Sequence, residues 1–406
     1  MNNIEKTYDL IVIGGGLVGL ASAYKIQKKM PQIKILILEK EKELALHQSG
    51  RNSGVLHSGL YYKPESYRAK NCVAGRRELV DFAKKHQINH EVCGKLVVAK
   101  NEKESLALPA LLKRGRNNGL ENLEIIDAKK IQEIEPFVRG FSAIWVPETG
   151  IIDYRAVANK FASLIKKINS ESEILTNSQV LKITHRSNNS IIHTQNRIFT
   201  GSKIISCAGL FSDRLAKEDG LKLDFKIVGF RGDYYTLTEK AKHKVNNIIY
   251  PVPNPEFPFL GVHFTRMING EIECGPNAVF TFKREGYNKM SFSLQDTLDS
   301  LTYIGTWKLF INHWQFGLKE MVKASSKNVF LKHLQQLIPS LETSDIESGR
   351  SGVRAMALGR DGEIIEDFQI ITKGNSIHVL NAPSPAATAC LSIGERVALE
   401  FLKKYN

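Results

Sequence analysis

The sequence predicts an α/β (α+β) protein made of two interwoven domains. The chain has 406 residues, 42% of them hydrophobic, which is enough for two buried cores of ordinary size. It opens with an apolar strand, a glycine-rich turn, a helical pattern and a second strand, as a doubly wound domain does. Strand-to-helix patterns return near residues 203 and 376. One domain is therefore expected to be assembled from separated segments, with the remaining chain forming the other.

The first element is a nucleotide-binding turn. Residues 8–29 read YDLIVIGGGLVGLASAYKIQKK, with Gly14-x-Gly16-x-x-Gly19 between strand and helix. These glycines permit a tight turn, backbone approach to a pyrophosphate and close helix-to-strand packing. The next strand ends on Glu39, whose carboxylate can accept hydrogen bonds from ribose hydroxyls. The spacing predicts a Rossmann-like dinucleotide site without choosing between NAD and FAD.

Three later segments favour a flavin. After Glu39 the chain enters a polar, glycine-rich loop over about residues 40–62, and a loop of this length in a compact domain is usually functional. A downstream strand ends on Ala208-Gly209, where small residues allow close approach to a ligand. The last segment is a strand, a proline-containing turn and a helix expected to begin near residues 386–388. Its N-terminal N–H groups would stabilise the electron-rich end of a reduced flavin.

Charge and cysteine content limit the partners. The net charge is +14, from 56 Lys and Arg against 42 Asp and Glu, which attracts acidic substrates or anionic surfaces. The lysines are scattered, without the basic stripe of a nucleic-acid site, so no nucleic acid is expected. Five cysteines without metal-ligand spacing predict no metal site and a reducing compartment. No targeting signal or membrane span is visible, so we expect a cytoplasmic protein, at most peripheral on the inner face of the membrane.

An aromatic segment, YIGTWKLFINHWQFGL, covers residues 303–318. Helical spacing places six large side chains on one face: Tyr303, Trp307, Phe310, Ile311, Trp314 and Leu318. This face could lie in a membrane interface, or pack against the second domain or another subunit.

Segments along the whole chain resemble one family. They include RNSGVLHSGLYYKPES, CGKLVVA, TGIIDYR, CAGLFSDR, FRGDYY, GPNAVFTFKREGY and NAPSPAAT. In order and spacing these are similar to the L-2-hydroxyglutarate dehydrogenase/oxidase family, FAD enzymes of the D-amino-acid-oxidase-like superfamily. The resemblance implies oxidation of the 2-hydroxy dicarboxylate L-2-hydroxyglutarate to 2-oxoglutarate, a metabolite-repair reaction. It also implies electron transfer to a membrane quinone or to oxygen. Two departures are Arg51, where some relatives have His, and the turn HFTRMING, which lacks a proline found in relatives.

The chemistry requires a base and cations. Oxidising a 2-hydroxy acid moves a hydride from C2 to the flavin while the hydroxyl loses a proton. His57, in the glycine-rich loop, is the favoured base, with His263 as the second candidate. Arg354 and Arg231 are candidate carboxylate clamps, because guanidinium groups bind carboxylates bidentately, although either could form a buried ion pair with Asp233 or Glu366 instead. Further candidate substrate contacts are Tyr61, Tyr62 and Asn277.

The cofactor contacts and domain limits follow from these assignments. FAD is expected to be non-covalent, because no cysteine or histidine matches a flavinylation motif. The residues expected to bind it are Gly14, Gly16, Gly19, Glu39, Lys40, Gln48, Ser49, Arg51, Asn52, Ser53, Val180, Ala208, Gly209, Ser212, Pro385, Ala386 and Thr388. The FAD-binding domain is expected over residues 1–84, 152–222 and 345–406. The substrate domain is expected over residues 85–151 and 223–344.

Two other functions fit parts of the pattern. The same scaffold would suit a flavin-dependent amine or amino-acid oxidase. A basic flavin-containing protein that binds nucleic acid is the third reading, although a pocket with His57 and arginines would then lack a purpose. The sequence does not distinguish quinone from oxygen as acceptor, nor does it give the oligomeric state.

Overall fold

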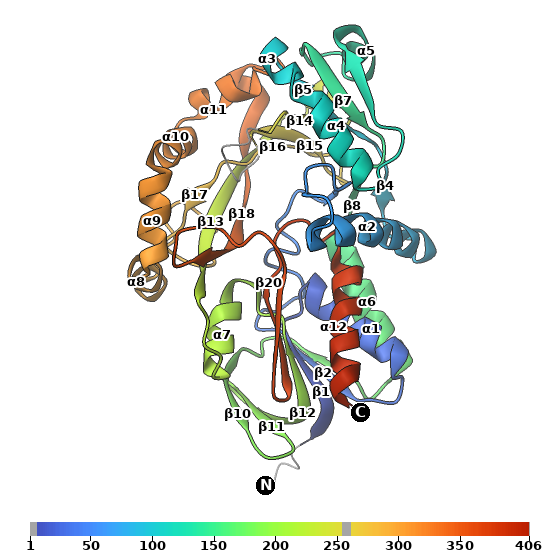
Figure 1. Ribbon diagram of the computed structural model, residues 1–406, viewed down its shortest axis with the longest axis vertical. Helices are drawn as coiled ribbons and strands as arrows, with labels where there is room; N and C mark the ends of the chain where they lie inside the picture. The colour runs from blue at the N-terminus through green and yellow to red at the C-terminus, as the bar shows by residue number, and fades with distance from the viewer. Residues whose placement is uncertain (1–5, 254–260, 406) are drawn as a thin grey trace.

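Two large sheets organise the molecule (Figure 1). The computed structural model describes residues 6–253 and 261–405. The strands are β1 (Thr7–Ile13), β2 (Ile35–Leu38), β3 (Val55–Leu56), β4 (His90–Glu91), β5 (Lys95–Ala99), β6 (Glu124–Asp127), β7 (Ser142–Val146), β8 (Gly150–Ile152), β9 (Glu173–Leu175), β10 (Val180–His185), β11 (Ser190–Thr194), β12 (Ile198–Ser206), β13 (Phe225–Leu237), β14 (Ile248–Pro251), β15 (His263–Arg266), β16 (Ile272–Gly275), β17 (Val279–Phe280), β18 (Ile346–Gly359), β19 (Gln369–Lys373) and β20 (Ser376–Asn381). The α-helices are α1 (Leu17–Lys29), α2 (Tyr67–Lys85), α3 (Glu102–Ser105), α4 (Leu108–Asn117), α5 (Ala128–Ile134), α6 (Tyr154–Ile168), α7 (Ser212–Glu218), α8 (Leu294–Leu301), α9 (Ile304–Asn312), α10 (Trp314–Ser325), α11 (Lys327–Leu334) and α12 (Cys390–Tyr405).

The first sheet has eight strands and a parallel centre. Its order is β10-β11-β12-β1-β2-β9, with β20 pairing β12 and β19 pairing β20. β1 lies parallel to both β2 and β12, so the ends of these strands meet at one edge. Helices α1, α6 and α12 pack together beside the sheet (Figure 1), and their apolar faces bury the largest core. This confirms the predicted doubly wound unit.

The second sheet has nine strands and is mixed. Its order is β17-β13-β16-β15-β14-β5-β7-β6, with the long strand β18 antiparallel to β13 and β14 parallel to β5. Helices α8 to α11 follow one side of this unit in Figure 1. β18 belongs here, although the predicted boundary assigned residues from 345 onward to the other unit. The chain returns to the eight-stranded sheet at β19.

Two features join the units. A small sheet, β3-β8-β4, brings residues 55–56 beside segments that border the second unit. A buried ion pair links Arg284, which precedes α8, to Asp213 on α7. Arg284 also contacts Asp299 of α8, at 2.9 Å. The candidate site residues described below come from segments on both sides of this junction.

Two predicted helices differ from the structure. The aromatic segment forms two helices, α9 and α10, that are separated at His313, so its side chains do not share one continuous helical face. The last helix begins at Cys390, after a turn over residues 384–389, and therefore starts later than the predicted residues 386–388. In the first segment the helical spacing of the sequence continues through His313, although the backbone departs from the helix there.

Candidate active site

The glycine turn fits a dinucleotide pyrophosphate. Gly14 has φ +107°, and a Cβ there would lie 2.3 Å from the Cys207 carbonyl oxygen. A Cβ on Gly19 would lie 2.2 Å from the Gly14 carbonyl oxygen, so neither position admits a side chain. Gly16 caps α1 without a side-chain hydrogen bond, and the first turn holds no acidic residue. The N-terminus of α1 therefore offers backbone N–H groups to an anion.

Glu39 and Ser49 complete this turn. Glu39 is buried at the end of β2 and accepts a hydrogen bond of 2.7 Å from the Gly15 backbone N–H. Its other carboxylate oxygen accepts from the Glu41 N–H at 3.0 Å. The Ser49 hydroxyl accepts from the Leu17 N–H at 2.9 Å, which brings the loop after β2 to the start of α1. Glu39 and Ser49 thus fix the loop after β2 against the turn where a ribose and a pyrophosphate would be expected to bind.

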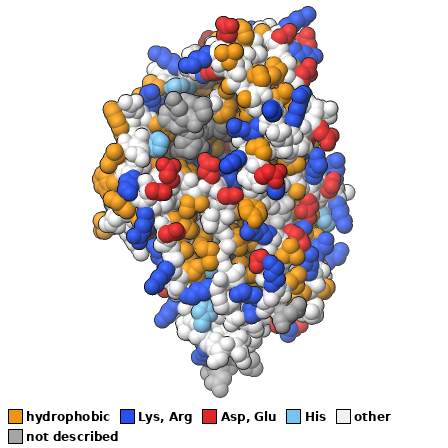
Figure 2. Space-filling model, in the orientation of Figure 1, with side chains coloured by type: hydrophobic (Ala, Val, Ile, Leu, Met, Phe, Trp, Pro, Cys, Tyr) orange, Lys and Arg blue, Asp and Glu red, His pale blue; other side chains and the backbone are white. Residues whose placement is uncertain are grey.

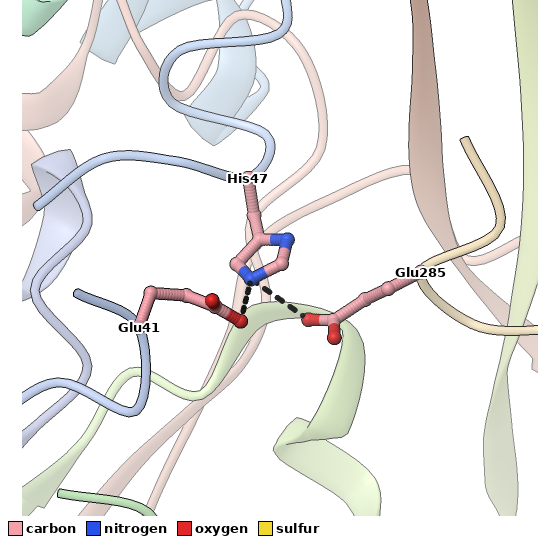
Figure 3. Close-up of side chains that lie close together, drawn as sticks. All are labelled: Glu41, His47 and Glu285. Atoms are coloured by element: carbon pink, nitrogen blue, oxygen red, sulfur yellow. Dashed lines mark hydrogen bonds and ion pairs between the residues drawn. The ribbon is translucent and has the colours of Figure 1, made fainter. Parts of the chain in front are cut away.

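The loop after β2 is fastened to the second unit by an ionic cluster (Figure 3). The Nε2 atom of His47 lies 3.0 Å from Glu41 and 3.1 Å from Glu285. The dashed lines in Figure 3 mark these two contacts. Among the described residues these are the histidine and carboxylate groups close enough to share a metal ion. The Lys40 ammonium, however, contacts Glu285 and lies 3.6 Å from Glu41. The carboxylates are thus compensated by a cation from the protein, and the cluster ties the loop in place.

Other predicted cofactor residues stabilise the same loop. Gln48 accepts a hydrogen bond from the Ala355 N–H at 3.2 Å, and a Cβ on Gly209 would lie 3.3 Å from its amide nitrogen. The Asn52 amide donates to the Gln48 carbonyl at 2.9 Å. The Arg51 guanidinium lies 3.9 Å from the centroid of the Tyr287 ring. Loop residues 48–52 are therefore held beside the turn at Gly209 and beside β18.

The remaining predicted cofactor residues lie at one edge of the first sheet, on α7 and in the turn before α12. Val180 opens β10, and Ala208 packs against the core beneath that edge of the first sheet. The Ser212 hydroxyl is occupied, since it donates to the Leu380 carbonyl at 2.7 Å. Pro385 and Ala386 lie in the turn before α12.

Thr388 connects that turn to the loop of His57. Its hydroxyl accepts a hydrogen bond of 3.1 Å from the His57 backbone N–H and lies 2.9 Å from the Tyr154 hydroxyl. The Ser384 carbonyl in the same turn accepts from Arg68 at 2.8 Å. The structure therefore brings together the two segments that the sequence placed near a flavin, residues 53–58 and 383–388.

His57 follows β3 and is neutral at physiological pH. Burial, together with the positive charge of Lys95 and the nearby His263 and Arg68, lowers the pKa of His57 to about 3. A neutral imidazole has a lone pair that can accept a proton. The imidazole itself has no hydrogen-bond partner among the described residues, whereas the His57 backbone N–H donates to the Thr388 hydroxyl.

His263 begins β15 and has a fixed orientation. Its Nδ1 atom lies 2.8 Å from the Gly261 carbonyl oxygen, and its ring centroid lies 3.9 Å from that of Tyr250. Because a carbonyl only accepts, Nδ1 carries the proton and Nε2 is left as an acceptor. Burial, with Arg354 and Lys95 nearby, lowers the pKa of His263 to about 3, an effect that the Gly261 hydrogen bond partly opposes. His57 and His263 are thus two neutral imidazoles that share one positively charged neighbour.

The two candidate arginines have different surroundings. Arg231 on β13 is paired with Asp233, with Nε 2.7 Å from Oδ1, and donates to the Asn288 carbonyl at 2.7 Å. This is the buried ion pair that the sequence left open as an alternative. Arg354 lies on β18, opposite Phe230 of β13. Its guanidinium donates to the Asn277 carbonyl oxygen at 3.5 Å, and its charge acts on His263.

The tyrosines and Asn277 also differ in role. The Tyr61 hydroxyl is buried without a hydrogen-bond partner among the described residues. The Tyr62 ring lies 4.7 Å below the Arg68 guanidinium. The Asn277 side chain is engaged, since it accepts from the Asp233 N–H at 2.8 Å.

Sequence reasoning missed three residues of this cluster: Lys95, Tyr234 and Tyr250. Lys95 is 1% exposed, and its Nζ atom lies 4.6 Å from the Tyr61 ring centroid and 5.0 Å from that of Tyr250. Burial lowers the pKa of Lys95 to about 7 and raises the pKa of Tyr234 to about 12. The sequence did contain a signal: Lys95 begins the otherwise apolar strand KLVVA, and a lysine is unusual in a buried strand because lysines lie mostly on the surface.

Comparison with known proteins defines the class first. Residues 9–399 match the family described as FAD dependent oxidoreductase, so the chain is an FAD-dependent oxidoreductase. L-2-hydroxyglutarate dehydrogenase of Indibacter alkaliphilus is 45% identical over 399 residues, which cover 98% of this chain and 100% of that protein. The mitochondrial L-2-hydroxyglutarate dehydrogenase of Homo sapiens is 42% identical, over 99% of this chain and 90% of that protein. The chain therefore belongs to the L-2-hydroxyglutarate dehydrogenase family.

Solved structures support the fold. L-α-glycerophosphate oxidase from Mycoplasma pneumoniae with FAD bound has a TM-score of 0.79 at 23% identity and covers 98% of this chain and 95% of its own. Glycine oxidase from Geobacillus kaustophilus has a TM-score of 0.72 at 14% identity, with coverage of 98% and 95%. At these identities the likeness concerns the fold alone.

Proposed function

We propose that this protein oxidises L-2-hydroxyglutarate to 2-oxoglutarate. The observation that carries the proposal is the full-length similarity, at 45% identity, to a protein named L-2-hydroxyglutarate dehydrogenase. The buried cluster around His57 supplies matching chemistry, because two neutral imidazoles lie near the cations Arg354 and Lys95. Bound FAD supplies the oxidising group, which takes up the hydride that leaves C2 of the substrate.

The imidazoles handle the hydroxyl proton. His57 accepts this proton. The hydroxyl carries one hydrogen, so the Nε2 atom of His263, which is also an acceptor, is the alternative base and not a second partner of the same hydrogen. Both side chains are neutral before substrate binds because their pKa values are lowered to about 3. A bound dianion offsets the positive charge of Arg354 and Lys95, which raises the proton affinity of both rings. The substrate thus strengthens the base that acts on it.

Arg354 binds one substrate carboxylate. It projects from β18, and its charge acts on His263, Tyr234 and Tyr250. A guanidinium at this point would hold the carboxylate by two parallel hydrogen bonds. Arg231 is the weaker candidate, since Asp233 and the Asn288 carbonyl already take up its donors.

The substrate assignment is tested by anaerobic flavin reduction. The purified protein is mixed with resolved L- and D-2-hydroxyglutarate, and with a panel of amines that includes glycine and sarcosine. Loss of the oxidised flavin absorbance with the L-enantiomer alone is the expected result. Reduction by amines alone would replace the hydroxy-acid assignment with an amine-oxidase one. Reoxidation of the reduced protein with a quinone and with oxygen, in separate experiments, identifies the acceptor.

We propose further that the outer face of α8 to α10 docks on an anionic membrane. Large apolar side chains on these helices are between 50% and 68% exposed: Leu298, Ile304, Trp307, Ile311, Trp314, Leu318, Met321 and Val322. Figure 2 shows hydrophobic side chains gathered along the edge of the molecule where Figure 1 places α9 and α10. Lys308 and Lys319 on the same helices are exposed. Apolar side chains with a basic surround favour an interfacial, anionic surface.

No helix among the described residues is long and apolar enough to cross a membrane. Docking is tested by sedimentation with vesicles of phosphatidylcholine alone and with added phosphatidylglycerol. Binding to the anionic vesicles that is lost in Trp307→Glu/Ile311→Glu is expected. Equal sedimentation of this variant and the wild type would contradict the proposal.

A further inference from the structure

Lys95 is an exception among the buried cations of this protein. Five lysines and arginines are buried among the described residues: Arg76, Lys95, Lys226, Arg231 and Arg284. The other four each form an ion pair with a carboxylate, from Glu148, Asp299, Asp233 and Asp213 respectively. Within the described ranges, no carboxylate lies within 4.0 Å of the Lys95 ammonium. A buried charge without a partner is costly, so it is retained where an anion arrives with a ligand.

The surroundings of Lys95 are those of a binding site. The Nζ atom lies between two aromatic rings, 4.6 Å from the centroid of Tyr61 and 5.0 Å from that of Tyr250. The Tyr61 hydroxyl is itself a buried polar atom without a partner among the described residues. The positive charge of Lys95 lowers the pKa of both candidate bases, His57 and His263. An unpaired cation, an unpaired hydroxyl and two neutral imidazoles thus come together.

We propose that Lys95 binds one of the two carboxylates of the substrate, with Arg354 binding the other. This inference rests on the proposed function, since it assigns the second charge of the dianion to a specific residue. Lys95 lies on β5 and Arg354 on β18, two strands of the nine-stranded sheet that are separated by several others. The charges of both side chains nevertheless act on His263, so the two cations converge on one imidazole from different strands. Selectivity for a dicarboxylate over a monocarboxylate follows from this arrangement.

Binding of the dianion should be linked to proton uptake. Burial lowers the pKa of Lys95 to about 7, while the Cys72 thiol acts in the opposite direction. The other titratable groups that face it are His57, His263 and the two tyrosines, Tyr61 and Tyr250. A carboxylate at the ammonium would raise the pKa of Lys95, so that above pH 7 the amine takes up a proton as the ligand binds. Affinity for a dianion should therefore fall about tenfold for each unit of pH above about 7.

The test uses glutarate, a dicarboxylate without a hydroxyl to oxidise. Its dissociation constant is measured on the oxidised FAD-containing protein, from the change in flavin absorbance, between pH 6 and 9. Lys95→Met should weaken glutarate by at least about tenfold at pH 6.5 and remove the pH dependence above 7. Lys95→Arg should retain measurable binding without an inflection near pH 7, because a guanidinium does not titrate there. The control is Lys100→Met, which removes a half-buried lysine that is paired with Glu104 just beyond β5.

A calorimetric measurement on the wild type tests the idea without any substitution. At pH 8, in buffers of different ionisation enthalpy, glutarate binding should take up close to one proton, and Lys95→Arg should abolish this uptake. Unchanged glutarate affinity and pH dependence in Lys95→Met, or no proton uptake by the wild type, would overturn the role of Lys95. Failure of the proposed function has a different signature, namely a wild-type flavin that L-2-hydroxyglutarate does not reduce.

Discussion

Replacing His57 by glutamine tests the assignment of the base. Glutamine is similar in size and retains hydrogen-bonding groups, but it cannot take up a proton at physiological pH. The His57 backbone N–H donates a hydrogen bond to the Thr388 hydroxyl. This contact does not depend on the His57 side chain, so the loop should keep its position. A positioned general base contributes about 10²–10⁴ to the rate. Because His263 remains as a second neutral imidazole, we expect a loss near the lower limit, about 10²-fold.

The assay is the rate of flavin reduction by L-2-hydroxyglutarate in anaerobic stopped flow. FAD content and the affinity for glutarate should stay near wild-type values in His57→Gln. The double variant His57→Gln/His263→Gln should approach the upper limit, about 10⁴-fold. His243→Gln is the matched control, since His243 is exposed and contacts the ring of Phe137 instead. Reduction of His57→Gln within about threefold of wild type, alongside a large loss in His263→Gln, would transfer the base role to His263.

Three further outcomes follow from the same contacts. Arg354→Met should lower kcat/KM for L-2-hydroxyglutarate by about 30-fold or more, with little change in FAD content. Arg231→Met should mainly lower the free energy of unfolding, by about 3–5 kcal/mol in urea, because it leaves the Asp233 carboxylate without its ion-pair partner. The opposite pattern would exchange the two assignments. Gly14→Ala should yield protein with little FAD, because its Cβ would lie 2.3 Å from the Cys207 carbonyl; full flavin absorbance would show that the turn can adjust. Acid precipitation should release all of the FAD into the supernatant, and flavin retained in the pellet would establish a covalent bond.

The sequence predicts the glycine turn and the strand that follows it because these elements are local. The three glycines, α1 and Glu39 lie within one βαβ unit, so their spacing along the chain determines their positions in space. The pairing of Arg231 with Asp233 was also within reach, since residues i and i+2 of a strand share a face. These predictions required no knowledge of how distant segments pack.

Lys95 shows why the rest of the site could not be predicted. Its burial depends on β14, which lies far along the chain, and on Tyr61, which belongs to the loop before α2. Nothing near it in the sequence indicates that no carboxylate will be placed opposite it. The break between α9 and α10 is similar, because helical spacing continues through His313 while the backbone does not. In each instance tertiary packing decides an outcome that local pattern leaves open.

The origin of these side chains bears on how the site distinguishes its substrate. His57 follows β3, Lys95 begins β5, His263 begins β15 and Arg354 lies on β18, so four separate segments contribute one group each. Burial lowers the pKa values of both imidazoles, and the nearby cations lower them further; the proposed carboxylate contacts would offset the contribution of the cations. A monocarboxylate would neutralise only one of the two cations, leaving the other to hold the pKa values of the imidazoles down. Under this proposal a dianion binds both cations and thereby raises the pKa values of the imidazoles. Removing one carboxylate from the substrate should therefore lower the rate of flavin reduction as well as the affinity.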